Sequence, residues 1–315
     1  MERIKLEKVK TFKLSSSPRK ISIEMFGTPP KEGISLKEFL LSLPKILGAK
    51  DLLEVARAIV EAKRKGKKVL LGMGAHPIKV GLNPYIIELM KRSVISLIGT
   101  NGASMVHDVE IALVGKTSEE VKEGLKDGSF GFAEETATFI NEALKRGLPK
   151  GKGAGEALGE AIWEEKLPYR EISLFGMAYK LGIPVTVHIA IGTDIFHMHP
   201  SATGSVIGEM SHRDFLTFSS EVTKLTEGIY LNLGSATIMP EVFLKALSLA
   251  RNLGHKVKNY ITINMDFLPQ YRALENVLHR PHETGGRASY FLRGHHEILF
   301  PLLVGAIIEG LTGNI

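Results

Sequence analysis

The chain has 315 residues, of which 44% are hydrophobic, enough for a core of one large α/β domain or two smaller ones. It contains no cysteine, which excludes disulfides, thiol catalysis and thiolate metal sites. Lysine and arginine exceed aspartate and glutamate by 40 to 34, and the two signs are interspersed, which argues against a nucleic-acid partner.

The ends of the chain and its composition suggest where the protein works. The charged, alternating N-terminus has no secretory pattern, so we expect a cytoplasmic protein. The apolar run 298–311 contains Pro301 and Glu309, so we expect a buried helix there and no membrane partner. Abundant lysine and glutamate, with Gln270 as the single glutamine, are typical of a thermophile.

Residues 1–34 predict an irregular N-terminal arm with one or two short strands, because SSSPRK and GTPPKEG form turns. Ser35 and Glu38 have capping-box spacing and predict the start of a helix, followed by a second helix over 50–65. Strands are then expected near 67–76, 93–102, 183–191, 228–237 and 259–267. Helices are expected near 83–93, 104–114, 118–128, 134–147, 156–166, 170–181, 239–254 and 298–311.

Strands that alternate with helices imply a parallel sheet with helices on both faces. The sequence therefore predicts a doubly wound, mostly parallel, Rossmann-like α/β fold. No repeat or low-complexity linker divides the chain, so we expect a single domain over 35–315 after the arm of 1–34.

All five expected strands end in small or polar residues. Glycine there permits a tight turn and close approach to a ligand, and the next helix offers free N–H groups to a phosphate. Because open α/β sheets bind ligands outside the carboxyl ends of their strands, we expect a nucleotide-type ligand at this edge. The expected contacts are Gly74, Thr100, Asn101, Gly102, Asp194, Gly234, Ser235 and Asn264.

Several histidines fall at the same strand ends, and histidine titrates near neutrality. We expect acid–base roles for His107, His197 and His199, the last two sharing a face if their segment is extended. An alternative is a metal-dependent hydrolase or lyase that uses these residues with His188 and Asp108. No strict metal motif such as HExxH is present, so we expect no metal.

The loop 279–291 is polar and glycine-hinged. Arg280 and Arg287 are candidate substrate ligands because arginine clamps carboxylates and phosphates, and Glu283 is a candidate catalytic residue. We expect this loop to form a lid over the site.

The order of motifs over residues 66–305 resembles the deoxyhypusine synthase family. The similar segments are GAHPIKVGL (74–82), the strand ending in TNG (100–102), IPV…GTD (183–194), LNLGSA (231–236), YITINMDF (260–267), RPHE (280–283) and FPLLVGA (300–306).

This resemblance implies an NAD-binding fold, with the positions around His76 and Lys79 among those that match the family's cofactor site. It also implies a homotetramer built from dimers, with active sites at the dimer interface. Family members oxidise spermidine with NAD and transfer its aminobutyl group through a lysine imine. The family's lysine has no counterpart in Arg287-Ala288-Ser289. We therefore expect a protein that binds NAD and a small anionic or neutral substrate, not a true deoxyhypusine synthase. A non-catalytic paralogue is a further alternative.

Overall fold

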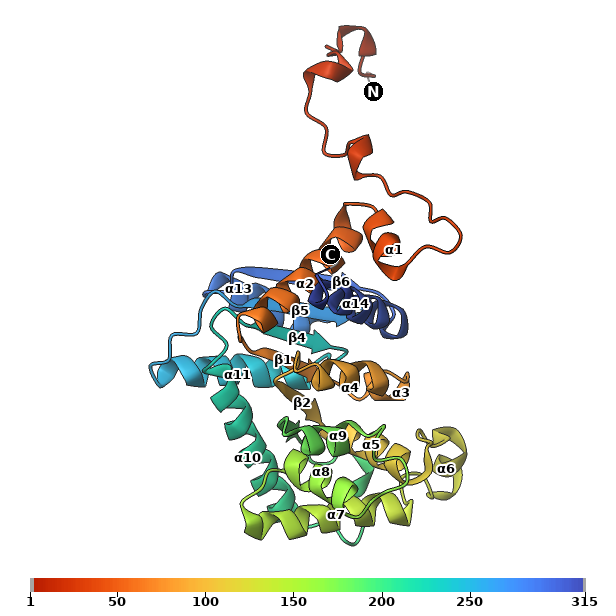
Figure 1. The fold of residues 1–315 in the computed structure, drawn as a ribbon, viewed down its shortest axis with the longest axis vertical. Coiled ribbons are helices and arrows are strands. Elements are labelled where there is room, and N and C mark those ends of the chain that lie inside the picture. Colours follow the sequence, from red (N-terminus) through yellow and green to blue (C-terminus); the bar gives the residue numbers. More distant parts are fainter. Residues whose placement is uncertain (1–2, 314–315) are drawn as a thin grey trace.

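The computed structural model describes residues 3–313 and contains a six-stranded sheet (Figure 1). The strands are β1 Val69–Met73, β2 Leu97–Asn101, β3 Val185–His188, β4 Ile229–Leu233, β5 Ile261–Asp266 and β6 Ala288–Arg293. Their order is β3-β2-β1-β4-β5-β6, and every neighbouring pair is parallel. This is the strand order of doubly wound dinucleotide-binding folds, so the predicted fold class is confirmed.

The central strands are continuous apolar runs because both of their faces are buried. Leu71 of β1 pairs with Leu231 of β4, and both side chains belong to the larger core. The adjacent pair, Leu70 and Tyr230, faces the smaller core on the other side of the sheet.

Helices cover both faces of the sheet (Figure 1). On the face of the larger core, α2 packs against α14; on the other, α10 packs against α11. The helices outside the arm and the insertion described next are α1 Leu36–Ser42, α2 Leu47–Arg64, α3 His76–Lys79, α4 Asn83–Lys91, α10 Gly204–Val222, α11 Ile238–Asn252, α12 Tyr271–Ala273, the π-helix Leu274–His279, α13 Arg280–Glu283 and α14 His296–Leu311.

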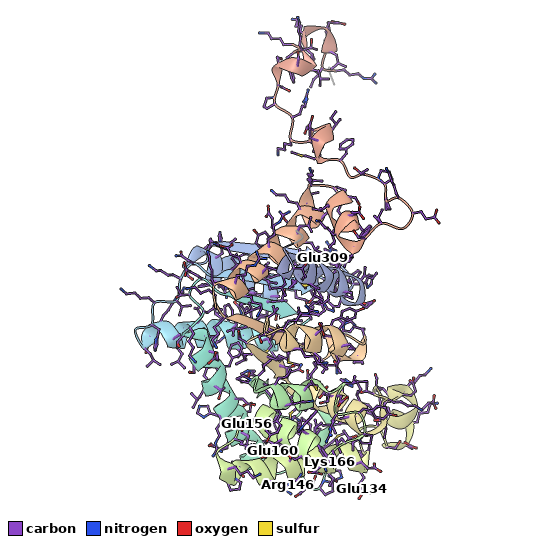
Figure 2. All side chains as sticks on the ribbon, in the orientation of Figure 1. Glu134, Arg146, Glu156, Glu160, Lys166 and Glu309 are labelled. Atoms are coloured by element: carbon purple, nitrogen blue, oxygen red, sulfur yellow. The ribbon has the colours of Figure 1, made fainter. Side chains whose placement is uncertain are left out.

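A group of helices is inserted between β2 and β3 and lies beyond that edge of the sheet (Figure 1). It comprises α5 Gly102–Val114, α6 Val121–Asp127, α7 Glu134–Gly147, α8 Ala154–Glu164 and α9 Leu174–Leu181. Its surface is charged; Glu156 and Glu160, labelled in Figure 2, both pair with Lys152.

Two buried carboxylates fix this helical insertion. Asp108 accepts hydrogen bonds from the backbone N–H groups of Leu174 (2.8 Å) and Phe175 (3.1 Å), at the start of α9. Asp214 likewise accepts from Gly155 (2.9 Å), at the start of α8, and from Val187 (2.7 Å) in β3. Each carboxylate therefore satisfies helix N-terminal donors that would otherwise be buried without partners.

The arm extends away from the rest of the chain (Figure 1). It forms 3-10 helices at Leu6–Lys8, Leu14–Ser16 and Ile23–Met25 in place of the expected short strands, and the capping box at Ser35 and Glu38 then opens α1 as predicted. Its apolar side chains are exposed: Ile4, Leu6, Val9, Phe12, Leu14, Ile21, Ile23 and Phe26.

Several elements differ from the sequence prediction. Helices α3 and α10 and the helical segment from α12 to α13 were not expected. Strand β6 was not expected either, and it begins within the segment predicted as a lid. The C-terminal run forms the buried helix α14, as predicted. Over residues 3–313, no helix has both the length and the apolarity needed to cross a bilayer.

Candidate functional site

The loops after β1 and β4 meet at the point where the strand order reverses. The backbone N–H of Gly74 donates to the carbonyl of Leu233 (3.2 Å), and a Cβ at Gly74 would overlap the Gly234 carbonyl oxygen. Gly234 has φ +62°, and a Cβ there would lie 2.6 Å from the His296 ring. Only glycine fits at either position without displacing a neighbour.

His76 and His296 are joined by a hydrogen bond at this point. Their Nδ1 atoms lie 3.0 Å apart, and His296 Nε2 lies 3.1 Å from the carbonyl oxygen of Met265. His296 is buried, whereas His76 is exposed. Burial is the main reason why the pKa of His296 is lowered.

The N-terminus of α11 opens onto the same loop. Ser235 Oγ accepts from the Met239 N–H (3.1 Å), while the N-cap Thr237 makes no side-chain capping bond. Ala236 and Thr237 are exposed. Met239 and Pro240 of the first turn are buried, the Met239 N–H is already bonded and proline has no N–H, so an anion such as a phosphate would contact the exposed backbone just before the helix, at residues 236–237.

A pocket of about 200 Å³ lies at the carboxyl end of β2, between α5 and the loop after β3. Lys79, His107 and Asp194 come together there from α3, α5 and the loop after β3. The other lining residues are Ala103, Val106, Glu110, Ser118, Glu119, Val121, Phe130, Thr193 and Ile195.

The titratable groups of this pocket are shifted by their surroundings. Burial raises the pKa of Asp194 to about 6, against a hydrogen bond from Thr193 Oγ1 (3.2 Å) that lowers it. Burial, and then the charge of Lys79, lowers the pKa of His107 to about 4. His107 is therefore neutral at pH 7.

The tautomer of His107 follows from its partners. Thr117 Oγ1 donates its proton to Glu110 (2.5 Å), so His107 Nδ1 must donate to Thr117 (2.6 Å). This leaves a lone pair on His107 Nε2.

His197 and His199 do not share an extended face, because Ile195–His197 forms a 3-10 helix. His197 Nδ1 accepts from the backbone N–H groups of Gly192 (3.1 Å) and Asp194 (3.3 Å) and so shapes the loop that carries Asp194. His199 instead bonds Ser201, which also accepts from Asn141 of α7. The extended segment that would have placed the two histidines on one face is therefore not formed.

His188 lies on the other face of the sheet. It lines a cavity of about 350 Å³ between α10 and α11, together with His212 and Glu241. Burial lowers its pKa to about 3. Within residues 3–313, no three histidine, aspartate or glutamate side chains converge as metal ligands would, so the residues of the hydrolase alternative are dispersed.

Residues 279–291, predicted as a lid, lie near the amino ends of the strands, whereas the candidate ligand site lies at their carboxyl ends. The Asn259 N–H bonds the Gly285 carbonyl, and the Arg287 N–H bonds the Tyr260 carbonyl, both at 2.7 Å. These contacts precede β5 and β6, so Glu283 and Arg287 lie at the amino ends of the strands. The lid position is thus corrected: because the segment leads into β6, it must enter the sheet from the amino edge.

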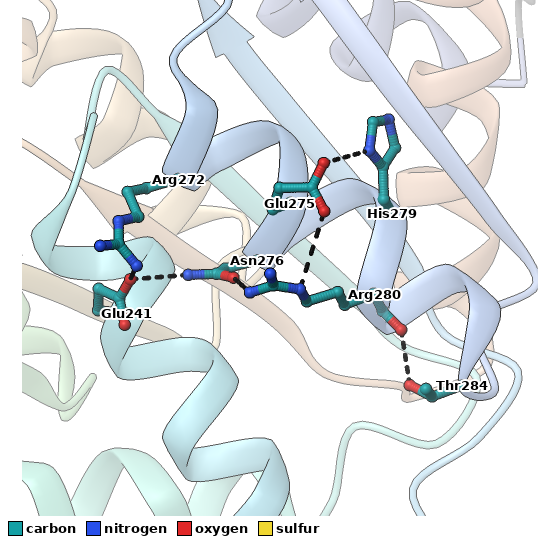
Figure 3. Close-up of polar contacts among 7 residues, drawn as sticks. All are labelled: Glu241, Arg272, Glu275, Asn276, His279, Arg280 and Thr284. Carbon is teal, nitrogen blue, oxygen red and sulfur yellow. Dashed lines mark hydrogen bonds and ion pairs between the residues drawn. The ribbon is translucent and has the colours of Figure 1, made fainter.

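Arg280 is held in a polar network along α11 and the π-helix (Figure 3). Its guanidinium donates to Asn276 Oδ1 (2.6 Å), and Asn276 Nδ2 donates to Glu241 (2.9 Å). Glu241 also pairs with Arg272 (2.7 Å). Arg280 is therefore bound to neighbouring helices and does not lie with Lys79, His107 and Asp194.

The remaining expected residues divide into two groups. Asn101 caps α5 through its side chain, and a Cβ at Gly102 would overlap Asp194, so the ends of β2 and β3 meet. Thr100 and Asn264 are fully buried, and their side chains bond Met73 and Asn232. Thr100 and Asn264 therefore stabilise the strand ends from within the core.

Sequence reasoning missed the role of His296, and it indicated Lys79 only through the family resemblance. His296 is the second residue of a His-His-Glu run, and no spacing links it to His76, 220 positions away. Lys79 lies three residues after His76 in the same short helix, so its position there was the available signal.

No protein-family model matches the chain, and neither does any curated protein. Solved structures do match. A protein assigned as a deoxyhypusine synthase from Entamoeba histolytica has a TM-score of 0.52 at 13% identity, over 90% of this chain and 96% of that one. A protein assigned to the LOR/SDH group from Methanococcus maripaludis S2 has a TM-score of 0.50 at 17% identity, over 98% of this chain and 75% of that one.

The ternary complex of AgrE with ornithine and NAD+ has a TM-score of 0.52 at 15% identity, over 83% of this chain. The chain spans only a third of AgrE and of the cyanobacterial arginine dihydrolase ArgZ, 33% of each. At these identities the likeness concerns the fold alone. The chain therefore has a deoxyhypusine-synthase-like α/β fold.

Proposed function

We propose that the protein binds NAD, or a closely related dinucleotide, across the carboxyl ends of β1, β2 and β4. The observation that carries this proposal is the meeting of the loops after β1 and β4, with Gly234 in a left-handed conformation and the exposed residues Ala236 and Thr237 beside it. Dinucleotides bind at this crevice in sheets with the same strand order.

The residues at this edge fit the chemistry of a dinucleotide. The exposed loop at Ala236 and Thr237 offers backbone N–H groups for a diphosphate. Asp194 offers a carboxylate of the kind that holds ribose hydroxyls. A bound NAD would supply a nicotinamide ring that accepts a hydride. The AgrE structure, which has a similar fold and holds NAD+ with ornithine, supports the assignment.

The pocket of Lys79, His107 and Asp194 is the proposed site of a small second molecule. Its volume of about 200 Å³ suits a compact substrate. Lys79 brings a cation, Glu110 and Glu119 bring carboxyl groups and His107 an unprotonated Nε2, while Asp194 is left to the ribose, so the pocket offers both charged and neutral polar contacts to a small molecule. The structure offers no support for the remaining expected roles, which are catalysis by His197, His199 and Glu283 and substrate binding by Arg280 and Arg287.

Calorimetric titration with NAD+ and NADH tests the cofactor proposal. Gly234→Ala should reduce NAD+ affinity at least tenfold, about 1.4 kcal/mol, because the added methyl group displaces the loop. Gly254→Ala is the matched control: Gly254 is also left-handed (φ +88°), but it borders open space at the end of α11. The proposal fails if the native protein binds neither nucleotide.

We also propose that the protein forms a homodimer or homotetramer. The exposed apolar side chains of the arm support this, since an isolated chain would leave them in water.

A further inference from the structure

The hydrogen bonds of His296 determine which atom of His76 carries a proton. A carbonyl oxygen only accepts, so His296 Nε2 must carry the proton that it shares with Met265. When His296 is neutral, its Nδ1 then holds a lone pair. His76 Nδ1, 3.0 Å away, must therefore be the donor, and His76 Nε2 is left with a lone pair.

The surroundings keep His296 neutral. Its side chain is buried, and burial lowers its pKa. The charged groups that face it are Asp266, at the end of β5, and Glu297, in α14; both act in the opposite direction, and His76 adds to the effect of burial. The two hydrogen bonds therefore have the same direction: His76 donates to His296, and His296 donates to the Met265 carbonyl in the sheet.

Backbone segments from two loops of the sheet pack against His76 and His296. Gly234 packs against the His296 ring, and His76 begins α3 directly after the loop of β1. Both histidines thus lie where the strand order reverses, at the site where the proposed dinucleotide binds.

We propose that His76 and His296 form a proton-accepting pair, in which His76 Nε2 takes a proton from a hydroxyl group of the bound ligand and His296 is the positioning residue. This inference rests on the proposed function for the ligand's location. The ligand O–H bond breaks, its electron pair stays on oxygen, and a new N–H bond forms at His76 Nε2. The resulting imidazolium keeps its Nδ1–H bond to His296, so nothing needs to reorient.

Nitrogen NMR of the full chain labelled with 15N-histidine tests the pair, with His76→Asn used for assignment. In the native protein, His76 should show a protonated Nδ1 and an unprotonated Nε2. His296→Phe removes the acceptor and should shift His76 toward the opposite tautomer, whereas His296→Gln retains an acceptor and should preserve it. His295→Phe, at the adjacent exposed residue, is the control that should change nothing. A protonated Nε2 on His76 in the native protein at pH 8 would overturn the proposal.

Reactivity provides a second readout that does not depend on the His296→Phe variant folding. Diethyl pyrocarbonate modifies unprotonated imidazole nitrogens, so it should modify the exposed His76 in the native protein at pH 8. An unreactive native His76 would contradict the proposal. Bound NAD+ should protect His76 from this modification. If His76 has the expected tautomer and reactivity but NAD+ gives no protection, the pair stands and the dinucleotide proposal fails.

Discussion

His76 Nδ1 lies 3.0 Å from His296 Nδ1, a contact that joins the loop after β1 to the start of α14. This hydrogen bond needs one ring to donate and the other to accept, and the bond from His296 to Met265 fixes which does which. Two residues far apart in the chain thereby orient one exposed imidazole at the point of the sheet where ligands bind.

The ionisation of Asp194 should make NAD+ affinity depend on pH. Burial raises its pKa to about 6, so the carboxylate is available to ribose hydroxyls at pH 7.5 and mostly protonated at pH 5. We expect affinity to fall by up to about tenfold over this range, as the ionised fraction falls. Asp194→Asn should bind NAD+ with little pH dependence in the same titrations. An unaltered pH profile in the variant would remove Asp194 from the site.

The buried His188 should make the fold sensitive to acid. Its pKa is lowered to about 3 in the folded state, while the unfolded chain takes up the proton near pH 6.5. The stability it contributes is therefore present above pH 6.5 and is lost as pH falls toward 3.

Between pH 7 and 5 this loss amounts to about 2 kcal/mol. Urea unfolding of His188→Asn should show a pH dependence that is smaller by this amount. His212→Gln, at an exposed histidine of the adjacent helix, should keep the native dependence. Equal slopes for the native protein and His188→Asn would contradict the prediction.

The carboxylate of Asp214 should contribute strongly to stability, since it holds the start of α8 against β3. Asp214→Ala leaves the N–H groups of Gly155 and Val187 buried without partners and should cost about 3 kcal/mol in urea unfolding. Glu209→Ala, which removes an exposed ion pair with Arg213 on the same helix, should cost less than about 1 kcal/mol. Similar costs for the two variants would show that Asp214 has no special role.

The apolar arm should determine the oligomeric state. A variant without residues 1–26 loses side chains such as Phe12 and Ile23, which have exposed fractions of 70% and 77%. Light scattering should report a homodimer or homotetramer for the full chain and fewer subunits per particle for the truncated one. Circular dichroism should be unchanged per residue outside the arm, as the control for folding. A full chain that is monomeric at all concentrations would contradict this account.

The order of strands and helices was readable from sequence because buried parallel strands are apolar and end in small residues. Leu70, Leu71 and Leu231, for example, lie in runs that only a sheet covered on both faces explains. Strand β6 was not predicted because its residues are only partly buried at the edge of the sheet and follow a glycine-rich turn. The lid was misplaced for the same reason: without β6, nothing showed that Arg287 precedes a strand.

The candidate site was only partly predictable. Gly74 and Gly234 directly follow β1 and β4, and Asp194 lies in the loop after β3, so topology alone brings them to one edge. The partnership of His76 with His296 depends on how α14 packs, which no local pattern encodes. His107 and Lys79 approach Asp194 only because α3 and α5 pack together.

A crystal structure of the protein with NAD+ tests the central claim most directly. The account predicts the dinucleotide at the carboxyl ends of β1 and β4, with its diphosphate at Ala236 and Thr237 and its other groups close to His76. NAD+ bound instead in the cavity between α10 and α11, or no bound NAD+ at saturating concentration, would contradict it.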